Sequence, residues 1–182
     1  MLADARKRPG ALNLGSAGVG SGTHLNGEKF KLAAGINGVH VPYKGTPEAL
    51  TGTMAGRISY FFAPISAALP HVRDGKVLAL CVSLAKHSAV LPNMPTVAES
   101  GLPGFDYSLW LGLFTPAGTP AEIVDKINRD LQRVLREPEV KERMATLGAE
   151  PMAMSPAEFD RFLRDEMDEA ARIVRAAGIK AQ

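Results

Sequence analysis

The first part of the chain alternates between short apolar runs and amphipathic stretches up to about residue 84. The runs have the length of strands, and the stretches between them have the apolar spacing of helices that cover a sheet. The predicted strands are residues 12–15, 38–43, 57–63 and 76–84, and the predicted helices are residues 24–34, 47–55 and 65–74. The last run is continuously apolar, which is typical of a strand buried on both faces. This order predicts an α/β fold with a mostly parallel sheet.

Local signals mark where the first two helices begin and end. Thr23 and Thr46 are the predicted N-caps, because a threonine hydroxyl can accept a hydrogen bond from a free backbone N–H of the first turn. Pro47 suits the first helical position. Gly35 and Gly56 suit the residue after the last turn, where the backbone becomes left-handed.

The alternation ends in a stretch rich in proline and glycine. Residues 87–105 contain one predicted short helix, which ends at Ser100, and residues 106–118 predict a long strand that carries the chain between lobes. Only helices follow. They are predicted within residues 119–137, 137–148 and 155–178.

Two of these helices begin with a predicted capping box, in which a hydroxyl and a carboxylate three residues apart satisfy each other's backbone N–H groups. The pairs are Thr119 with Glu122 and Ser155 with Glu158. All three helices carry an apolar stripe on one face. Because this half of the chain has little strand to cover them, we expect the stripes to stay largely uncovered.

Composition excludes several classes of protein. The 182 residues are 46% hydrophobic and 22% charged, with a net charge of +2, which suits one medium domain or two small ones. The charge is too small to indicate nucleic-acid binding, and no apolar stretch reaches the roughly 18 residues of a membrane helix. Residues 1–10 lack the apolar core of a signal peptide and resemble the end of a helix without its beginning. Cys81 is the single cysteine, so no internal disulfide forms.

The loop GSAGVGSGTH, from Gly15 to His24, joins the first strand to the first helix. It does not fit a nucleotide site: Ser21 stands where a phosphate loop has lysine, and Thr23 stands where a dinucleotide fingerprint has its third glycine. A glycine-rich turn into a helix does expose N–H groups at the positive end of a helix dipole, which suits an anion. A tight turn that needs glycine only for its backbone explains the spacing equally well.

Two further turns follow strands and therefore lie at the same edge of a parallel sheet, where open α/β folds bind ligands. The turn after the second strand is Tyr43, Lys44, Gly45 and Thr46, and the turn after the third contains Ala63. The alternatives are a solvated charge for Lys44 and core packing for Tyr43.

Catalysis has weak support. Ser21 and His24 could form a nucleophile and base, but no carboxylate that would orient the histidine is evident. The four histidines lack metal-ligand spacing, and Cys81 belongs to a buried-looking run that indicates an inert core thiol. We expect no enzyme activity, no metal and no cofactor.

Several stretches together resemble one family. HVPYKGTPEAL, ALPHVRDGK and PTVAESGLPGF are the most specific, and LGLFTPAGTP and LGAEPMAMSPAEF extend the similarity across essentially the whole chain. The chain resembles the Bug family of extracytoplasmic solute receptors, the substrate-binding proteins of tripartite tricarboxylate transporters.

The resemblance implies a two-lobed periplasmic binding protein fold of type II that closes on a small organic anion, usually a di- or tricarboxylate. It implies membrane components of the transporter as partners, a periplasmic location and no nucleic acid. The residues implied in ligand binding are Ser16, Gly18, Ser21, Gly22, Thr23, Tyr43, Lys44, Gly45, Thr46 and Ala63. Ala63 departs from the family, because many members carry aspartate there, and this departure disfavours an amino acid as ligand.

Family members are longer than this chain. We therefore expect residues 1–10 to be the end of a truncated helix, residues 11–105 a nearly complete second lobe, and residues 106–182 a crossover strand and helices of the first lobe. Half a binding site and exposed apolar surface would favour self-association. The competing hypotheses are a small α/β hydrolase that uses Ser21 and His24, and a regulatory domain that binds protein through its helices.

Overall fold

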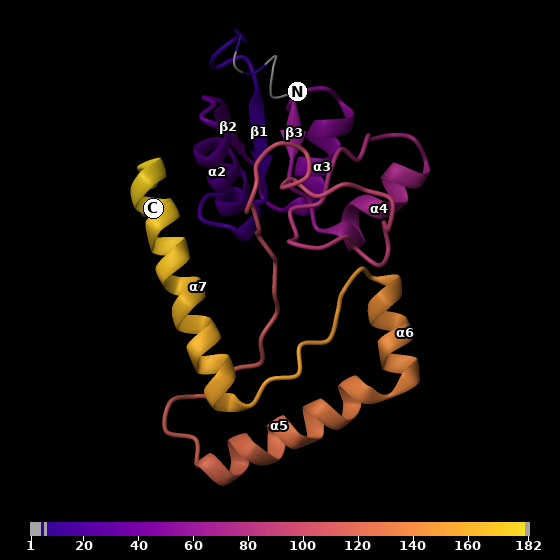
Figure 1. The fold of residues 1–182 in the computed structure, drawn as a ribbon, viewed down its shortest axis with the longest axis vertical. Coiled ribbons are helices and arrows are strands. Elements are labelled where there is room, and N and C mark those ends of the chain that lie inside the picture. The colour runs from indigo at the N-terminus through magenta and orange to yellow at the C-terminus, as the bar shows by residue number, and fades with distance from the viewer. Residues whose placement is uncertain (1–4, 6, 181–182) are drawn as a thin grey trace. The chain divides into compact units, whose positions relative to one another are not determined.

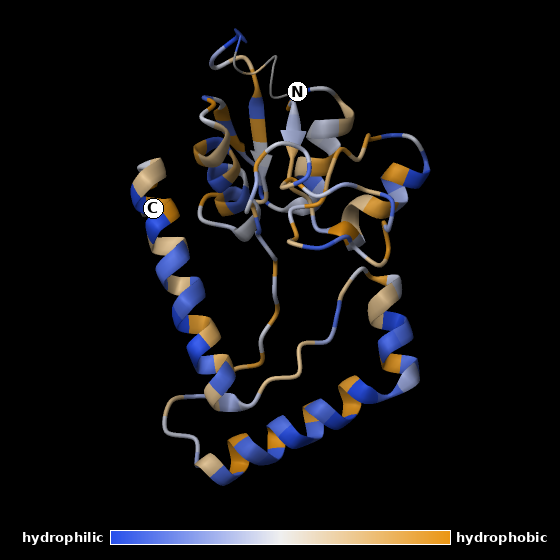
Figure 2. Ribbon diagram, in the orientation of Figure 1, coloured by the Kyte–Doolittle hydropathy of each residue, from blue (hydrophilic) through white to orange (hydrophobic). Residues whose placement is uncertain are grey.

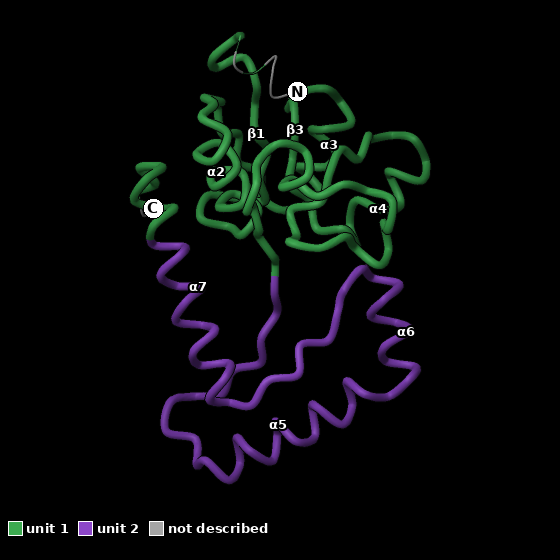
Figure 3. Tube along the Cα trace, in the orientation of Figure 1, with its two compact units in different colours: residues 1–109, 172–182 green, residues 110–171 purple. Residues whose placement is uncertain are grey.

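The structure is a computed structural model, and it describes residue 5 and residues 7–180 (Figure 1). The chain divides into two compact units (Figure 3). Unit 1 comprises residues 1–109 and 172–182, and unit 2 comprises residues 110–171. The predicted helix end at residues 1–10 lies largely outside the described residues.

Unit 1 is built on a parallel sheet whose strand order is β2-β1-β3 (Figure 1). Strands and helices alternate along the chain, which confirms the predicted α/β fold through its first six elements. The strands are β1 (Asn13–Ser16), β2 (Val39–Pro42) and β3 (Tyr60–Phe61), and the helices are α2 (Gly22–Ala34), α3 (Thr46–Met54) and α4 (Ile65–Arg73). Because β1 and β2 are parallel, with Ser16 paired to Pro42, the turns that follow them begin side by side.

The core of unit 1 lies around the central strand. Leu14 of β1 is fully buried, and Phe30 of α2 makes edge contacts with Tyr60 and Phe105 at ring-centroid distances of 5.8 and 6.3 Å. Burying each large apolar side chain contributes roughly 1.5–3 kcal/mol. This packing holds α2 against the sheet and so fixes where the loop between β1 and α2 lies.

The predicted fourth strand, residues 76–84, does not form among the described residues. Leu78 and Leu80 are 83% and 49% exposed, and the segment's one strand-like pairing is the bridge between Val82 and Thr96. A strand needs a neighbour with free backbone groups, and the two-residue β3 offers very few. The apolar run predicted a strand that is buried along its whole length. Val82 is indeed buried, but Leu78 and Leu80 are exposed.

Two more predictions fail in the segment that follows. The expected helix ending at Ser100 is a single turn, in which Ser100 N donates to Thr96 O at 3.0 Å and Gly101 N donates to Ala98 O at 3.3 Å, and it ends because Gly101 turns left-handed with φ 112°. The expected long strand at residues 106–118 is irregular along its whole described length. Its alternating apolar residues predicted a strand, but its backbone finds no neighbouring strand to pair with.

Three helices follow in the described chain: α5 (Ala121–Arg136), α6 (Pro138–Thr146) and α7 (Pro156–Ala177). The first two belong to unit 2, and α7 begins in unit 2 and ends in unit 1. Apolar and polar residues alternate along α5 with helical spacing, as the colouring of Figure 2 shows. Neither α5 nor α6 contains a buried residue, and in α7 only Ile173 is buried. Among the described helices, none has the length and apolar character that crossing a bilayer requires.

One of the two predicted capping boxes forms. Ser155 N donates to Glu158 Oε2 at 2.8 Å and Glu158 N donates to Ser155 Oγ at 3.3 Å, so α7 begins as predicted. The other prediction is wrong: the Thr119 hydroxyl donates to Pro116 O at 2.8 Å, and α5 starts without a side-chain cap. A competing turn around Pro116 takes the hydroxyl away from the helix.

Candidate functional site

The turns after β1 and β2 meet at one edge of the sheet. Tyr43 N donates to Ser16 O at 3.0 Å, which joins the two turns directly. Gly18 has φ 133°, and a side chain at that position would lie 3.5 Å from Tyr43 O. Glycine is therefore favoured here for its backbone conformation, since the space beside Tyr43 O would admit a side chain.

The loop between β1 and α2 is held by its own hydroxyl groups. Ser21 is the N-cap of α2: its hydroxyl accepts from His24 N at 3.3 Å and donates to Gly18 O at 2.7 Å. Thr23, the predicted N-cap, instead accepts a hydrogen bond from Ala17 N at 2.9 Å. That prediction was wrong by two residues, because the helix begins earlier and the Thr23 hydroxyl folds back onto the loop.

This arrangement leaves backbone donors free at the start of α2. Within the described part of the chain, the N–H groups of Val19, Gly22 and Thr23 have no acceptor, whereas Leu25 N already donates to Ser21 O at 3.0 Å. The first N–H groups of a helix carry the positive end of its dipole. Free donors in that field can bind an anion such as a carboxylate.

The second turn supplies a further helix start and a cation. Gly45 is the N-cap of α3, with φ 153°, and no side chain caps this helix. The prediction of Thr46 as N-cap is therefore wrong by one residue, since the unusual backbone of Gly45 lets the helix start there. Lys44 is exposed, and its N–H donates to Glu48 Oε2 at 3.2 Å.

Tyr43 has a packing role. A side chain at Gly52 of α3 would collide with the Tyr43 hydroxyl and ring, so the tyrosine lies against this bare position of the helix. Its backbone, through the bond to Ser16 O, is the part that faces the first loop. Ala63 is half-buried, two residues beyond the end of β3 and at the same sheet edge.

A cluster of ionisable side chains that the sequence analysis missed lies beside the loop. The rings of His24 and His40 are stacked, with centroids 3.6 Å apart and planes within 10°. His24 Nε2 lies 3.5 Å from Glu28 Oε1, and Lys31 Nζ lies 2.7 Å from the same oxygen. His40 Nε2 lies 2.6 Å from the hydroxyl of Ser16, which is fully buried.

The electrostatics of this cluster favour neutral histidine and charged glutamate. Burial and the neighbouring His24 lower the pKa of His40 to about 4. Burial raises the pKa of Glu28, but hydrogen bonds from His24 and Lys31 and the charge of Lys31 outweigh it, so the net pKa of Glu28 is lowered. Helical spacing of three and four residues from Glu28 to Lys31 and His24 was the available sequence signal.

The structure places a carboxylate beside His24, since Glu28 Oε1 lies 3.5 Å from His24 Nε2, but it does not pair the histidine ring with the Ser21 hydroxyl. The Ser21 hydroxyl is bonded to the loop and to Thr23, while the His24 ring accepts from Gly20 N at 3.0 Å and faces Glu28. Ser16 does contact a histidine, but a fully buried hydroxyl cannot reach a substrate. Burial raises the pKa of the half-buried Cys81 thiol, which keeps it protonated. No metal-binding group of three or more side chains occurs among the described residues.

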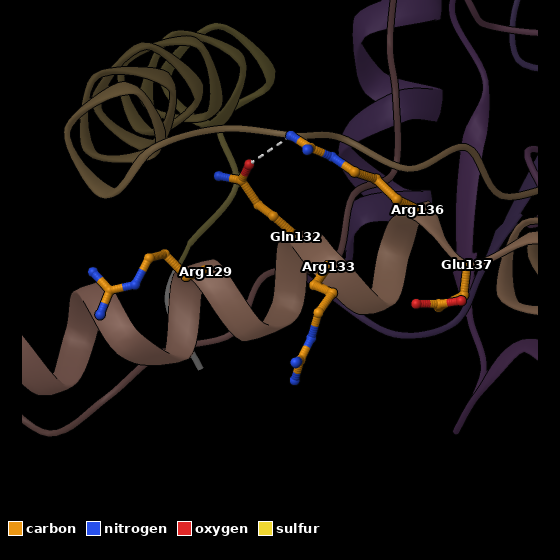
Figure 4. A pocket seen from close by; sticks show the side chains of 5 residues that line it. All are labelled: Arg129, Gln132, Arg133, Arg136 and Glu137. Atoms are coloured by element: carbon orange, nitrogen blue, oxygen red, sulfur yellow. Dashed lines mark hydrogen bonds between the residues drawn. The ribbon is translucent and has the colours of Figure 1, made fainter.

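A surface hollow of about 420 Å³ lies elsewhere, at the end of α5 (Figure 4). Arg136 Nη2 donates to Gln132 Oε1 at 3.5 Å there, and the arginine side chains extend into solvent instead of converging. Cations at a helix C-terminus are favoured by the dipole, so this group needs no ligand to explain it. The lining residues are Arg129, Gln132, Arg133, Arg136 and Glu137.

A parallel sheet with two helix N-termini converging on one edge is the ligand-binding arrangement of open α/β proteins. Comparison with known proteins defines the family: residues 1–179 match the tripartite tricarboxylate transporter family receptor. The chain belongs to this family, and its fold is that of the periplasmic binding proteins.

Similar proteins include relatives known from sequence and proteins of solved structure. BugT of Bordetella pertussis strain Tohama I is 32% identical over 99% of this chain and 55% of its own length. Rpa4515 of R. palustris, solved with adipate, is 32% identical with a TM-score of 0.89 over 98% of this chain and 60% of its own. MatC of Rhodopseudomonas palustris, solved with malate, is 31% identical with a TM-score of 0.82 over 95% and 60%. The chain thus spans somewhat more than half the length of these relatives.

Proposed function

We propose that this chain binds a small organic carboxylate at the paired turns after β1 and β2. The observation that carries the proposal is the set of free N–H donors at Val19, Gly22 and Thr23, of which the last two are the first N–H groups of α2 and carry the positive end of its dipole. The exposed ammonium group of Lys44 adds a charge at the neighbouring turn. A ligand with two carboxylates could use both turns.

Relatives support this ligand class. Two similar structures hold adipate and malate, and both of these ligands are dicarboxylic acids. The proposed contact residues are those that the family resemblance implies. They are Ser16, Gly18, Ser21, Gly22, Thr23, Tyr43, Lys44, Gly45, Thr46 and Ala63. Within this set, Gly22 and Thr23 act through their N–H groups, whereas Ser16 O and Tyr43 N bond each other and hold the two turns together.

In this proposal the chain is part of a periplasmic receptor that delivers its acid to the membrane components of a tripartite tricarboxylate transporter. Residues 11–105 form one ligand-binding lobe, and residues 106–182 supply helices of the other. The exposed apolar side chains of Leu111, Leu113 and Phe114 favour self-association of this 182-residue chain.

The test is an amide NMR titration with adipate and malate, accompanied by calorimetry and by ATP as a control anion. We expect the amide protons of Val19, Gly22 and Thr23 to move downfield as a carboxylate accepts from them. The amide of Leu25 is the internal control, since it is already bonded to Ser21 O. Absence of heat and of amide shifts with both acids, or equal shifts with ATP, would refute the proposal.

A further inference from the structure

The stacked pair His24–His40 is linked by hydrogen bonds to the glycine loop. Gly20 N donates to His24 Nδ1 at 3.0 Å. The Ser16 hydroxyl bonds His40 Nε2 at 2.6 Å and also accepts from Gly18 N at 3.2 Å. Both rings are thus linked, directly or through Ser16, to Gly18 and Gly20, the loop residues on either side of Val19.

These bonds define the protonation state that the loop requires. Because Nδ1 of His24 accepts a hydrogen bond, it carries no proton, and the ring proton is on Nε2, which faces Glu28 at 3.5 Å. His24 is only 3% exposed, so water has little access to replace the bond. A proton on Nδ1 would set two N–H donors against each other, and the loop would have to move.

Further ionisable groups around the pair come from α2 and β3. On α2, the charged carboxylate of Glu28 forms an ion pair with Lys31, whose Nζ lies 2.7 Å from Glu28 Oε1. Lys31 Nζ also donates to Gly38 O at 3.1 Å. On β3, burial raises the pKa of Tyr60, which stays protonated. Burial and His24 lower the pKa of His40 to about 4, so at neutral pH this ring is neutral and can stack closely on its neighbour.

We propose that His24 and His40 are positioning residues of the carboxylate site: as stacked, hydrogen-bonded rings they hold the backbone of residues 16–20 so that the donors of Val19, Gly22 and Thr23 stay free and aligned. This inference rests on the proposed function. It assigns the rings no contact with the ligand, and it predicts that the loop loses its conformation when the acceptor on His24 is lost.

The test compares matched substitutions at one position. His24→Asn keeps an acceptor at the δ position and cannot titrate, whereas His24→Leu keeps similar bulk without an acceptor. We expect adipate affinity to fall about tenfold in His24→Leu, as for one lost structural hydrogen bond, and to recover largely in His24→Asn. His40→Gln against His40→Leu provides the same comparison for the bond to Ser16.

Ligand-free NMR separates this inference from the proposed function. In the wild type, the Gly20 amide should be protected from exchange, because it donates to His24 Nδ1. In His24→Asn it should stay protected, and in His24→Leu it should exchange rapidly. If carboxylates fail to bind the wild type but Gly20 behaves as expected, the proposed function fails and the positioning role stands. If the Leu variants fold, bind adipate as the wild type does and keep Gly20 protected, the positioning role is overturned.

Discussion

At the scale of single residues, the backbone donors and the lysine charge have different roles in the proposed site. The free N–H groups at the start of α2 supply direction, because their positions are fixed by the helix. The side chain of Lys44 supplies a mobile positive charge at the adjacent turn. Sequence alone located both turns, but it could not show which N–H groups the loop's own hydroxyls already occupy.

Lys44→Gln should weaken adipate binding about fivefold, since an exposed cation in contact with an anion contributes a modest amount in water. The effect should shrink at high salt, because the charge is screened. Calorimetry at two ionic strengths measures the loss of adipate affinity and its dependence on salt. Lys76→Gln is the control, because it removes the same charge from an exposed lysine that pairs with Asp74 at 3.0 Å. Equal losses of adipate affinity in Lys44→Gln and Lys76→Gln would show that the net charge of the chain, and not the position of Lys44, determines the effect.

His40 should make folding stability depend on pH. Its pKa is about 4 in the folded chain and about 6.5 when unfolded, so the unfolded state binds more protons between these values. Its stabilising contribution is therefore complete above about pH 6.5 and is lost as the pH falls towards about 4. The loss should reach roughly 2 kcal/mol, allowing for partial solvent access to the ring.

Urea unfolding at a series of pH values measures this loss. In His40→Gln the curve should be flatter over the upper part of the window, before carboxylates with lowered pKa values such as Glu28 begin to titrate. A wild-type stability that is constant down to the range where carboxylates protonate would contradict the low pKa of His40.

At the scale of elements, the longer helices form where they are predicted, although the Ser155–Glu158 box alone among their predicted start signals is observed, and the strand predictions failed where a strand needs a partner. The segments 76–84 and 106–118 have apolar patterns that favour strands, but strand formation depends on a neighbouring edge that no local pattern reveals. The N-caps moved by one or two residues because Ser21 and Gly45 compete with Thr23 and Thr46 for the same role. The stacked histidines come from two elements, and only the tertiary fold brings them together.

The two candidate capping boxes give a direct comparison. Ser155→Ala should lower the stability of the region around α7 by about 1 kcal/mol, because it removes the acceptor for Glu158 N. Thr119→Ala should change stability by only a few tenths of that amount, since its hydroxyl bonds Pro116 O outside the helix. Hydrogen exchange of the first amides of α7 and α5 measures each effect locally. A larger loss from Thr119→Ala than from Ser155→Ala would contradict the observed caps.

At the scale of the whole molecule, the two units differ in how they are stabilised. Unit 1 has a sheet and an aromatic core, and the residues named for the proposed site all lie in it. Unit 2 has amphipathic helices with no buried residue in α5 or α6. Helices of this kind gain most of their stability by packing their apolar face against another surface.

That imbalance predicts concentration-dependent association of this chain. Leu111 is fully exposed, and Leu113 and Phe114 are 63% and 59% exposed on the same segment, which makes a patch that water solvates poorly. Light scattering across a range of concentrations should show a mass above that of the monomer, and the double variant Leu111→Ser, Phe114→Ser should shift it towards monomer. Leu32→Ser, at a 47% exposed position on α2, should leave the mass unchanged. A wild-type chain that stays monomeric at every concentration would show that the exposed helices satisfy their apolar faces within one molecule.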